Sequence, residues 1–448
     1  MTGETDVSDV YIRLFKTHPC LVEIKAPNIT DVALKVLGSL SNRVLSSFIS
    51  FNSSATDNGL QALCSGCPSL KHLSLDWPLT SSDASVQAIA SHCPRMESLS
   101  LQGWSSLTDL SLTSLSLMHA LRVVDLSWSG SFSSSAVQDL VKSCRNLEEL
   151  KLSIAKGSVD ALFRCIGTYS PQLKVFHFGG GRVTCDSVVA LVRGCPLLEE
   201  LVFDFLCGFG PDDRTLYIIA EACPRLKVLT LDKMTRNTCS DQGMIALSRG
   251  CPDLRELHLH NSAITDATIL SFAEHNHKLD SIKIIMNDNI TRNALVTLFE
   301  VNRIITDIEL IMCTKVDDVC VLARAQHCHK LKTIYIMDCQ TTTEPPLSTL
   351  IMCNEHLEDL SINDSTITDN FITLLIHHCK CLRKVQLAVC FNITERGLYT
   401  LLEYSKYLTC ISVYLCGIEA SVQVRERLAS RPEYKRVEVT INNEKINA

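Results

Sequence analysis

The stretch CPDLRELHLHNSAITDATIL, residues 251–270, decides the fold of this chain. Its leucines Leu254, Leu257 and Leu259 follow the spacing L-x-x-L-x-L, in which alternate apolar side chains point to one face of a short strand. A Thr-Asp pair at 265–266 then opens a second apolar run, as expected at the start of a helix. The stretch therefore predicts one strand–loop–helix unit, which is informative only if the unit recurs.

The unit recurs along nearly the whole chain. Its first apolar residue, the anchor, returns every 24 to 28 residues, although the pattern is weak after Leu45, where Ser50 takes the third apolar place. Such a period is typical of a repeat solenoid, because one unit cannot bury its own apolar face and must stack on the next. The anchors are Leu21, Leu45, Leu70, Met96, Leu121, Leu147, Leu173, Leu198, Leu226, Leu254, Leu279, Ile305, Leu331, Leu357, Leu382, Leu408 and Tyr434.

The cysteines follow the same period. The chain has 22 of them, and we expect reduced thiols in buried slots, because no secretory signal opens the sequence and cysteine is small and weakly polar. Eight lie three residues before an anchor and four lie eight residues after one: Cys67, Cys93, Cys144, Cys195, Cys223, Cys251, Cys328 and Cys379, then Cys313, Cys339, Cys390 and Cys416.

The combined pattern is C-P-x-L-x-x-L-x-L-x-x-C, then I-T-D-x-x-L and a helix. Residues 251–270 match it, as do residues 379–398, CKCLRKVQLAVCFNITERGL. Over residues 21–440 the chain resembles the cysteine-containing class of leucine-rich-repeat proteins, best known from the F-box/leucine-rich-repeat subunits of cullin-type ubiquitin ligases. The resemblance implies an α/β solenoid of the ribonuclease-inhibitor type: a horseshoe of about sixteen repeats with a parallel sheet on the concave side and helices on the convex side.

The resemblance also implies a function. It indicates a protein-interaction scaffold in the cytoplasm or nucleus, acting as the substrate-recognition component of an SCF-type ligase in ubiquitin-dependent degradation, with cullin-ligase components as further partners. The short segment 1–20 contains no F-box motif. The alternative is therefore a stand-alone repeat regulator of signalling or the cell cycle. Residues 21–440 are predicted to form the repeat domain, followed by a polar tail at 441–448.

Composition argues against other classes of function. The net charge of −7 disfavours a nucleic-acid partner, and no apolar run approaches the ~20 residues that cross a bilayer. Cys64-Ser-Gly-Cys67 is a lone C-x-x-C pair without a second pair. Because no catalytic motif is found either, we expect a protein that is not an enzyme and that uses no metal, cofactor or membrane.

Three successive units carry tryptophans where the predicted strand runs into its loop. Trp77 and Trp128 lie seven residues after their anchors and Trp104 lies eight after its own, with Phe205 at the seventh position of a later unit. Aromatic side chains along one rim would anchor a partner, because large rigid side chains dominate interface energetics. The alternative is that these rings cover the sheet edge or fill the loop interior.

The solvent-facing strand positions, four and six residues after each anchor, change in chemistry along the array. Acidic residues mark several earlier units, and three later units carry an apolar stripe typical of a protein-binding patch, unless a C-terminal tail or a partner repeat covers it. Protein partners on the concave face are predicted to contact Asp76, Trp77, Trp104, Trp128, His177, Asp204, Phe205, Asp232, His258, His260, Ile285, Met286, Ile311, Met312, Tyr335 and Met337.

Overall fold

The structure is a computed structural model of the 448-residue chain. The chain divides into two compact units, a first that runs to residue 210 and a second that runs on from residue 237, and residues 211–236 are divided between them. Each unit is described by itself. The structure describes residues 7–18, 20–40, 44–51, 53–77, 81–204, 211–230, 239–260, 263–339, 342–363, 366–404, 406–414, 416, 418, 425–426, 437–442 and 444–446.

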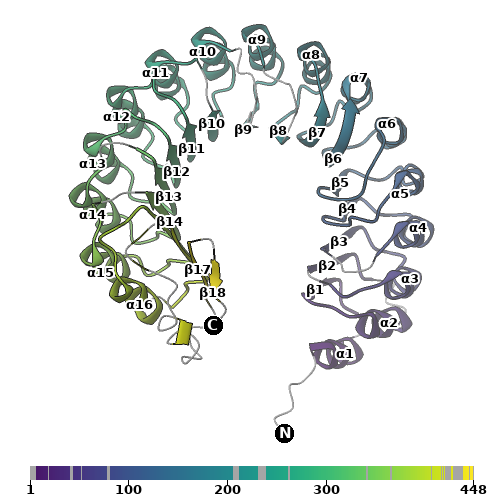
Figure 1. Ribbon diagram of the computed structural model, residues 1–448. Helices are drawn as coiled ribbons and strands as arrows, with labels where there is room; N and C mark the ends of the chain where they lie inside the picture. Colours follow the sequence, from purple (N-terminus) through teal and green to yellow (C-terminus); the bar gives the residue numbers. More distant parts are fainter. Residues whose placement is uncertain are drawn as a thin grey trace. The chain divides into compact units, whose positions relative to one another are not determined.

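In the first unit, strands and helices alternate along the chain, and β1 to β8 pair in parallel, each with the next (Figure 1). The helices lie along one side of this sheet (Figure 1). The elements are α1 (Val7–Thr17), β1 (Glu23–Lys25), α2 (Asp31–Ser39), β2 (Ser47–Phe51), α3 (Asp57–Gly66), β3 (His72–Asp76), α4 (Asp83–His92), β4 (Ser98–Ser100), α5 (Asp109–Leu115), β5 (Val123–Leu126), α6 (Ser134–Ser143), β6 (Glu149–Ser158), α7 (Asp160–Tyr169), β7 (Val175–Arg182), α8 (Cys185–Gly194) and β8 (Glu200–Asp204).

The second unit repeats this arrangement. Strands β9 to β17 pair in parallel, and β18 closes the series antiparallel to β17. The elements after β8 are α9 (Asp213–Ala222), β9 (Val228–Thr230), α10 (Asp241–Gly250), β10 (Glu256–His260), α11 (Asp266–His275), β11 (Ser281–Ile285), α12 (Arg292–Val301), β12 (Asp307–Ile311), α13 (Asp318–His327), β13 (Thr333–Met337), α14 (Glu344–Met352), β14 (Asp359–Asn363), α15 (Asp369–His378), β15 (Lys384–Ala388), α16 (Glu395–Tyr404), β16 (Cys410–Tyr414), β17 (Glu438–Ile441) and β18 (Glu444–Ile446).

The predicted α/β leucine-rich-repeat solenoid is confirmed, and its interior follows from alternate burial along each strand. In β3, Leu73 and Leu75 are each 1 % exposed, and the alternate residues His72, Ser74 and Asp76 face away from the helices. The unit after Leu45, whose apolar pattern is weak, is stabilised in a different way. Ser50 is fully buried, and its hydroxyl donates to the carbonyl oxygen of Ala26 at 2.7 Å, so a hydrogen bond replaces the missing apolar contact.

The two ends of the chain carry elements that the sequence did not predict. Helix α1 packs on α2, with Phe15 fully buried and the Tyr11 hydroxyl donating to the carbonyl oxygen of Pro27 at 2.9 Å. At the other end, part of the expected polar tail forms β18, in which Ile446 pairs with Val439. Both elements cover an exposed end of the stack, as repeat arrays require.

Eleven of the twelve repeat cysteines are buried thiols, as predicted, and Cys416 is partly exposed. The Sγ of Cys195 donates to the carbonyl oxygen of Ser170 at 3.3 Å, and that of Cys379 to the carbonyl oxygen of Asn354 at 3.5 Å, so each thiol contacts the preceding repeat. Burial raises the pKa of Cys195 and Cys379 to about 12, which keeps them protonated at neutral pH. The described cysteines form no disulfide.

A second contact between repeats runs along the helix starts. The first residue of most helices is an aspartate, and its carboxylate accepts hydrogen bonds from the backbone and hydroxyl of the Ser or Thr that caps the next helix. Asp241, for example, accepts from Thr265 N at 2.9 Å and from its Oγ1 at 2.7 Å. We call this series the aspartate ladder: Asp31–Thr56, Asp57–Ser82, Asp83–Thr108, Asp109–Ser133, Asp160–Thr184, Asp213–Ser240, Asp241–Thr265, Asp266–Thr291, Asp318–Thr343, Glu344–Thr368 and Asp369–Thr394.

One interior position departs from the repeat. Arg324 of α13 stands where α12 and α14 have Leu298 and Leu350, and all three side chains are buried. The guanidinium nitrogens of Arg324 donate to no partner among the described residues, and its Cζ lies 5.8 Å from the centre of the Phe299 ring. Burial lowers the pKa of Arg324 to about 10, so the charge persists at neutral pH in an apolar interior.

Candidate protein-binding face

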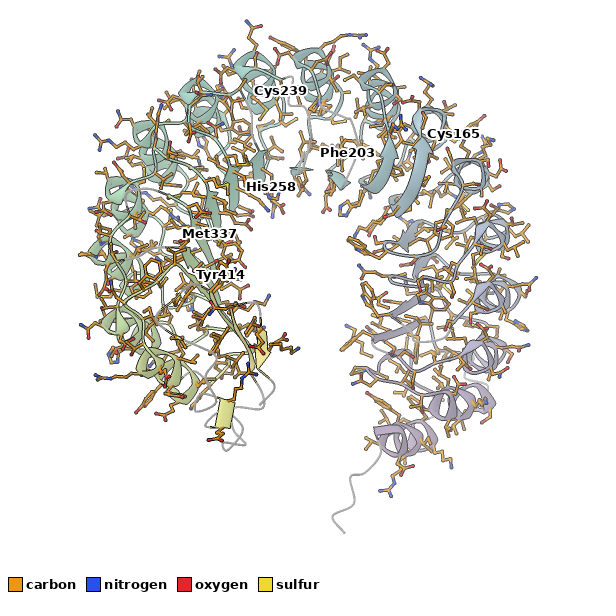
Figure 2. All side chains as sticks on the ribbon, in the orientation of Figure 1. Cys165, Phe203, Cys239, His258, Met337 and Tyr414 are labelled. Atoms are coloured by element: carbon orange, nitrogen blue, oxygen red, sulfur yellow. The ribbon has the colours of Figure 1, made fainter. Side chains whose placement is uncertain are left out.

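Among the described side chains of strands β10 to β14 in the second unit, those of the first, third and fifth residues lie on the side away from the helices. We call this side of the five strands the sheet face. His258 and Met337, labelled in Figure 2, belong to it. Because the strands pair in register, residues at the same place in successive strands form rows across the face. Neighbouring strands are about 4.8 Å apart, so the side chains of a row are within contact distance.

The fifth row is apolar over β11, β12 and β13, and the residues at this place in β10 and β14 are His260 and Asn363. Ile285, Ile311 and Met337 stand opposite one another in β11, β12 and β13, and each is half-buried. Met286 and Met312 follow directly and are 46 % and 47 % exposed. The structure therefore brings together all five residues of the predicted apolar stripe in one patch.

The backbone of the two methionines is in a conformation that favours glycine. Met286 has φ 54° and Met312 has φ 53°, and left-handed backbone costs a non-glycine residue about 1 kcal/mol. The bend lets the Met286 amide donate to Ile311 O at 2.9 Å and the Met312 amide to Met337 O at 2.8 Å. The same position is left-handed in other repeats as well, at Asn28, Trp77, Gly103, Trp128, Asp338 and Val389, so this backbone conformation is a property of the repeat. A methionine at this position therefore exposes an apolar side chain to solvent, and its backbone conformation costs free energy.

The first row is acidic and lies at the opposite end of the same strands. A hollow of about 510 Å³ opens there. Its described lining combines five carboxylates with three Ser and Thr residues, and His258 and Tyr335 of the third row complete it. The carboxylates are those of Glu256, Asp280, Asp307, Glu309 and Asp359, and the hydroxyls are those of Ser281, Thr306 and Thr333.

The charges of this hollow are only partly compensated within the face. Lys283 Nζ lies 3.1 Å from a Glu309 oxygen, and His258 Nε2 lies 3.6 Å from a Glu256 oxygen. Burial raises the pKa of Asp280, with Arg255 opposing the rise and the Asp307 carboxylate adding to it. Burial also raises the pKa of Tyr335, and carboxylates of Asp359 and Glu309 contribute. Around Tyr335, where three carboxylates act against the single lysine Lys283, the field favours a cation.

The acidic row was missed by sequence reasoning, which considered only positions four and six after each anchor. Glu256, Asp307 and Asp359 lie two residues after Leu254, Ile305 and Leu357. That position is the first of each strand and faces the same side as the other two. The acidic row could have been predicted from the sequence if each strand had been expected to begin two residues after its anchor.

The structure describes only some of the other residues in the second unit that were predicted to contact a partner. His258 is in the third row, with 17 % of its side chain exposed, and Tyr335 stands in the same row. His260 ends β10, but its side chain lies outside the described residues, as does all of Asp232.

In the first unit, the three tryptophans do not form one exposed strip. Trp77 and Trp128 are 50 % and 58 % exposed, with φ 55° and 58°. Trp104 is 1 % exposed, and its Nε1 donates to Leu75 O at 2.5 Å. The expectation of a binding role on the surface is wrong for Trp104. Lying one residue further from its anchor than the other two, it follows Gly103 and turns inward.

The two exposed tryptophans have different surroundings. A Cβ on Gly103 would lie 2.5 Å from the Trp77 ring, so that ring packs flat over the glycine. Trp128 rims a hollow of about 300 Å³ whose lining includes His177, Gly179 and Gly180. His177 Nε2 lies 3.0 Å from a Glu200 oxygen, and burial lowers the pKa of His177, with Lys151 adding to the effect and Glu200 opposing it.

Asp76 and the residues after β8 complete the predicted set. Asp76 accepts hydrogen bonds from Ser100 Oγ at 2.8 Å and Ser74 Oγ at 3.2 Å, so it is engaged within the sheet. Asp204 ends β8 and its side chain is outside the described residues, as is all of Phe205.

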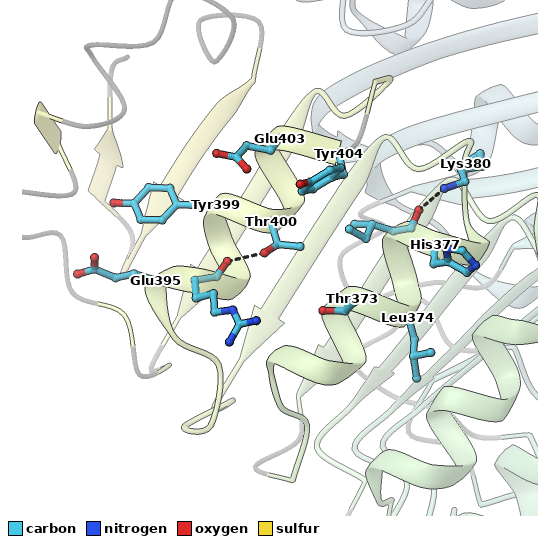
Figure 3. Close-up of a pocket in the computed structure, with 11 residues that line it drawn as sticks. Thr373, Leu374, His377, Lys380, Glu395, Tyr399, Thr400, Glu403 and Tyr404 are labelled. Carbon is cyan, nitrogen blue, oxygen red and sulfur yellow. Dashed lines mark hydrogen bonds between the residues drawn. The ribbon is translucent and has the colours of Figure 1, made fainter.

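The helix side of the second unit carries a wider groove that the sequence did not predict. It lies between α15 and α16, has a volume of about 910 Å³ and includes His377, Lys380 and Tyr404 in its lining (Figure 3). The hydrogen bonds drawn there run within each helix: Thr400 Oγ1 donates to Arg396 O at 2.7 Å, and Lys380 Nζ to Ile376 O at 2.8 Å. The side chains of Thr400 and Lys380 are thus engaged locally.

Two further kinds of site were sought in the described part of the chain. Within it, no group of three or more His, Cys, Asp or Glu residues is arranged to hold a metal ion. No helix described by the structure has the length and apolar character needed to cross a membrane.

Comparison with known proteins yields similarities in structure but none in sequence. No protein-family model and no curated protein matches the chain. Among solved structures, the crystal structure of the Rad7 and Elc1 complex in yeast contains a similar chain: the match has 14 % sequence identity and a TM-score of 0.45, covering 93 % of this chain and 86 % of that one. At this level of likeness the match carries no argument, and the repeat fold rests on the strands and helices described above.

Proposed function

We propose that this chain is a protein-interaction scaffold that binds a partner on the sheet face of its second unit. The observation that carries the proposal is the fifth row, Ile285, Ile311 and Met337, in register across three strands and bordered by two methionines about half exposed. A contiguous apolar patch on a protein surface is typical of an interface.

Binding rather than catalysis is the second part of the proposal. The polar side chains of the sheet face stand in rows, with neighbours in a row about 4.8 Å apart, and the closest charged pairs, Lys283–Glu309 and His258–Glu256, are formed within the sheet. Such an arrangement offers many separate contacts to a large partner. It does not converge a nucleophile, a base and an oxyanion donor on one point, as acyl-transfer chemistry needs.

The role of the scaffold is the third part. The cysteine pattern resembles that of the F-box/leucine-rich-repeat ligase subunits, and its thiols lie in buried slots between repeats, where such a pattern is structural. We therefore propose that the bound partner is a substrate for ubiquitin-dependent degradation, and that the chain is a substrate-recognition component linked to an SCF-type ligase in the cytoplasm or nucleus. The alternative is a repeat regulator of signalling or the cell cycle that binds its partner without a ligase.

The binding proposal is tested by comparing proteins that the tagged full chain captures from cells with those captured by M286S/M312S. Proteins bound through the sheet face should be lost from the double variant. The matched control is L270S/M352S, which makes the same kind of change at side chains 44 % and 45 % exposed on helices α11 and α14. An unchanged set of captured proteins with M286S/M312S would contradict the proposal.

The ligase link has a separate test. The tagged chain is expressed in cells, and the purified complex is examined for a cullin and its Skp-type adaptor. Their presence in stoichiometric amounts is expected for a ligase component. Capture of a partner without either protein would favour the stand-alone regulator.

A further inference from the structure

We infer that the partner of the sheet face presents a cationic and apolar segment, in which Lys or Arg side chains reach the first row while an apolar side chain covers the fifth row. This inference rests on the proposed function, because it names the chemistry of the partner at the same face. It commits to a protein segment that is positively charged at one edge and apolar at the other.

The two rows are separated by a fixed distance. They are four residues apart along each strand, and a parallel strand rises about 3.3 Å per residue, so the acidic and apolar rows lie ~13 Å apart. The third row lies midway and contains His258, Lys283, Glu309 and Tyr335. A partner segment that covers both ends therefore spans three rows of side chains, which is the reach of an ordinary helix or strand laid across the face.

Charge complementarity indicates a cation at the first row. The hollow there is lined by five carboxylates and by no Lys or Arg among its described lining residues. The nearest lysines already contact acidic residues: Lys283 lies 3.1 Å from Glu309, and Lys384 lies 3.7 Å from Asp359 with 60 % of its side chain exposed. Asp280 is half-buried, and Arg255 attracts its carboxylate while Asp307 repels it. A cation from a partner would relieve this excess of negative charge.

The spacing of the carboxylates favours several separate cations over one metal ion. In the first row Glu256, Asp307 and Asp359 stand on alternate strands, with Ser281 and Thr333 between them. Alternate strands are about 10 Å apart, whereas ligands of one calcium ion lie about 2.5 Å from it. Ammonium or guanidinium groups on separate side chains fit that distance. The same carboxylates repel phosphate, which excludes nucleic acid from this edge.

The apolar end defines the other half of the segment. Ile285, Ile311 and Met337 form the floor, and Met286 and Met312 stand beside them on the rim. Methionine adapts its shape to the group it contacts, so this end accepts a Leu, Met or Phe side chain and imposes little geometric selection. The acidic end therefore supplies most of the discrimination between partners.

The test measures binding of fluorescein-labelled peptides to the purified full chain by fluorescence anisotropy. Four 14-residue peptides are used: one with Lys and Leu clusters four to five positions apart, one with Lys replaced by Ser, one with Leu replaced by Ser, and one with Lys replaced by Glu. The Lys/Leu peptide should bind about tenfold more tightly than either single-feature peptide, and the Glu/Leu peptide should bind most weakly. Raising the salt concentration should weaken the Lys/Leu peptide most.

Variants of the chain locate the binding. D307N/D359N should weaken the Lys/Leu peptide about fivefold, because two partly exposed ion pairs are lost, and should leave the peptide without Lys unchanged. E274Q/E355Q removes equal charge from carboxylates with 73 % and 78 % exposed side chains outside the face, and should have no effect. Equal binding of the Lys/Leu and Glu/Leu peptides, or an unchanged affinity in D307N/D359N, would overturn the inference. Tight binding of a labelled 14-nucleotide DNA strand would also overturn it.

Capture of the cellular partner by the two double variants distinguishes failure of this inference from failure of the proposed function. Loss of capture in M286S/M312S but not in D307N/D359N would leave the sheet face as the binding site and remove the cationic partner. Unchanged capture in both variants would remove the proposed function as well.

Discussion

Residues at the helix starts recur from repeat to repeat, whereas residues on the sheet face change. At the helix starts, the aspartate ladder places the same carboxylate against the same Ser or Thr cap in one repeat after another. On the sheet face, residues at equivalent positions change from His258 to Lys283, Glu309 and Tyr335 in four successive strands. This difference indicates that residues which recur in every repeat hold neighbouring units together, whereas residues which vary at one strand position are available to recognise a partner.

The tryptophans of the first unit give the largest expected effect. W104A should destabilise the chain by about 4 kcal/mol, because it removes a fully buried ring and leaves a cavity. W128A should change the free energy of unfolding by less than about 0.5 kcal/mol, since its ring is 58 % exposed. Urea denaturation of the full chain measures both. Equal losses in the two variants would remove the distinction between interior and face in this unit.

Arg324 is a charged residue at an interior position that is leucine in the two neighbouring helices. R324L should raise the free energy of unfolding by about 3 kcal/mol, because it replaces a buried and unsatisfied charge with the residue type found in α12 and α14. R303L, at a residue whose side chain is exposed and donates to Glu300 O, is the control and should be nearly neutral. Thermal or urea unfolding gives the sign directly. A destabilised R324L would show that the arginine is required in the interior.

The aspartate ladder should give a smaller loss that depends on pH. Burial tends to raise the pKa of Asp160, but hydrogen bonds from Ser187 and Thr184 outweigh it and lower that pKa to about 2. D160A should cost about 2 kcal/mol at pH 7, since several hydrogen bonds to a charged acceptor are lost. The depressed pKa means that this increment is present above the unfolded value near 4 and lost as the pH falls toward 2.

The pH dependence of unfolding for wild type and D160A provides the measurement. Their difference in free energy should be constant above about pH 5 and should shrink as the medium becomes more acidic. D139A is the control, because Asp139 lies on the surface of α6 with 70 % of its side chain exposed and contacts only Lys142 among its described ion pairs. A difference that grows on acidification would contradict a lowered pKa for Asp160.

The effect of sheet-face substitutions on stability should be the smallest. M286S/M312S should change the free energy of unfolding by less than about 0.5 kcal/mol, because both side chains are about half exposed. The same denaturation experiment measures it. A loss above about 2 kcal/mol would place these methionines in the packed interior and would remove the argument that they serve a partner.

Much of this fold could be predicted from the sequence, because a period is visible in one dimension. The strand, the buried cysteine and the helix cap of the unit at 251–270 all follow from local pattern. What Asp266 does could not be predicted from its own unit. Its carboxylate reaches Thr291 N at 2.6 Å, and that neighbour is set by the pitch between stacked repeats.

The candidate site was less predictable for a related reason. The apolar stripe was found because its five residues fall at two adjacent positions in the repeat, but the depth of a side chain changes from one such position to the next. Trp128 and Trp104 differ by one place after their anchors, and that step separates an exposed ring from a buried one. The acidic row depends on where each strand begins, which hydrogen bonds between repeats decide.

The most direct test of the account is the affinity of the captured partner for I311K, measured together with the unfolding free energy of the variant. Ile311 stands at the centre of the fifth row, between Ile285 and Met337. A lysine there adds charge and removes the apolar floor while remaining able to extend into solvent. The account predicts at least a tenfold loss of affinity with stability changed by less than about 1 kcal/mol. Unchanged affinity in a folded I311K chain would contradict it.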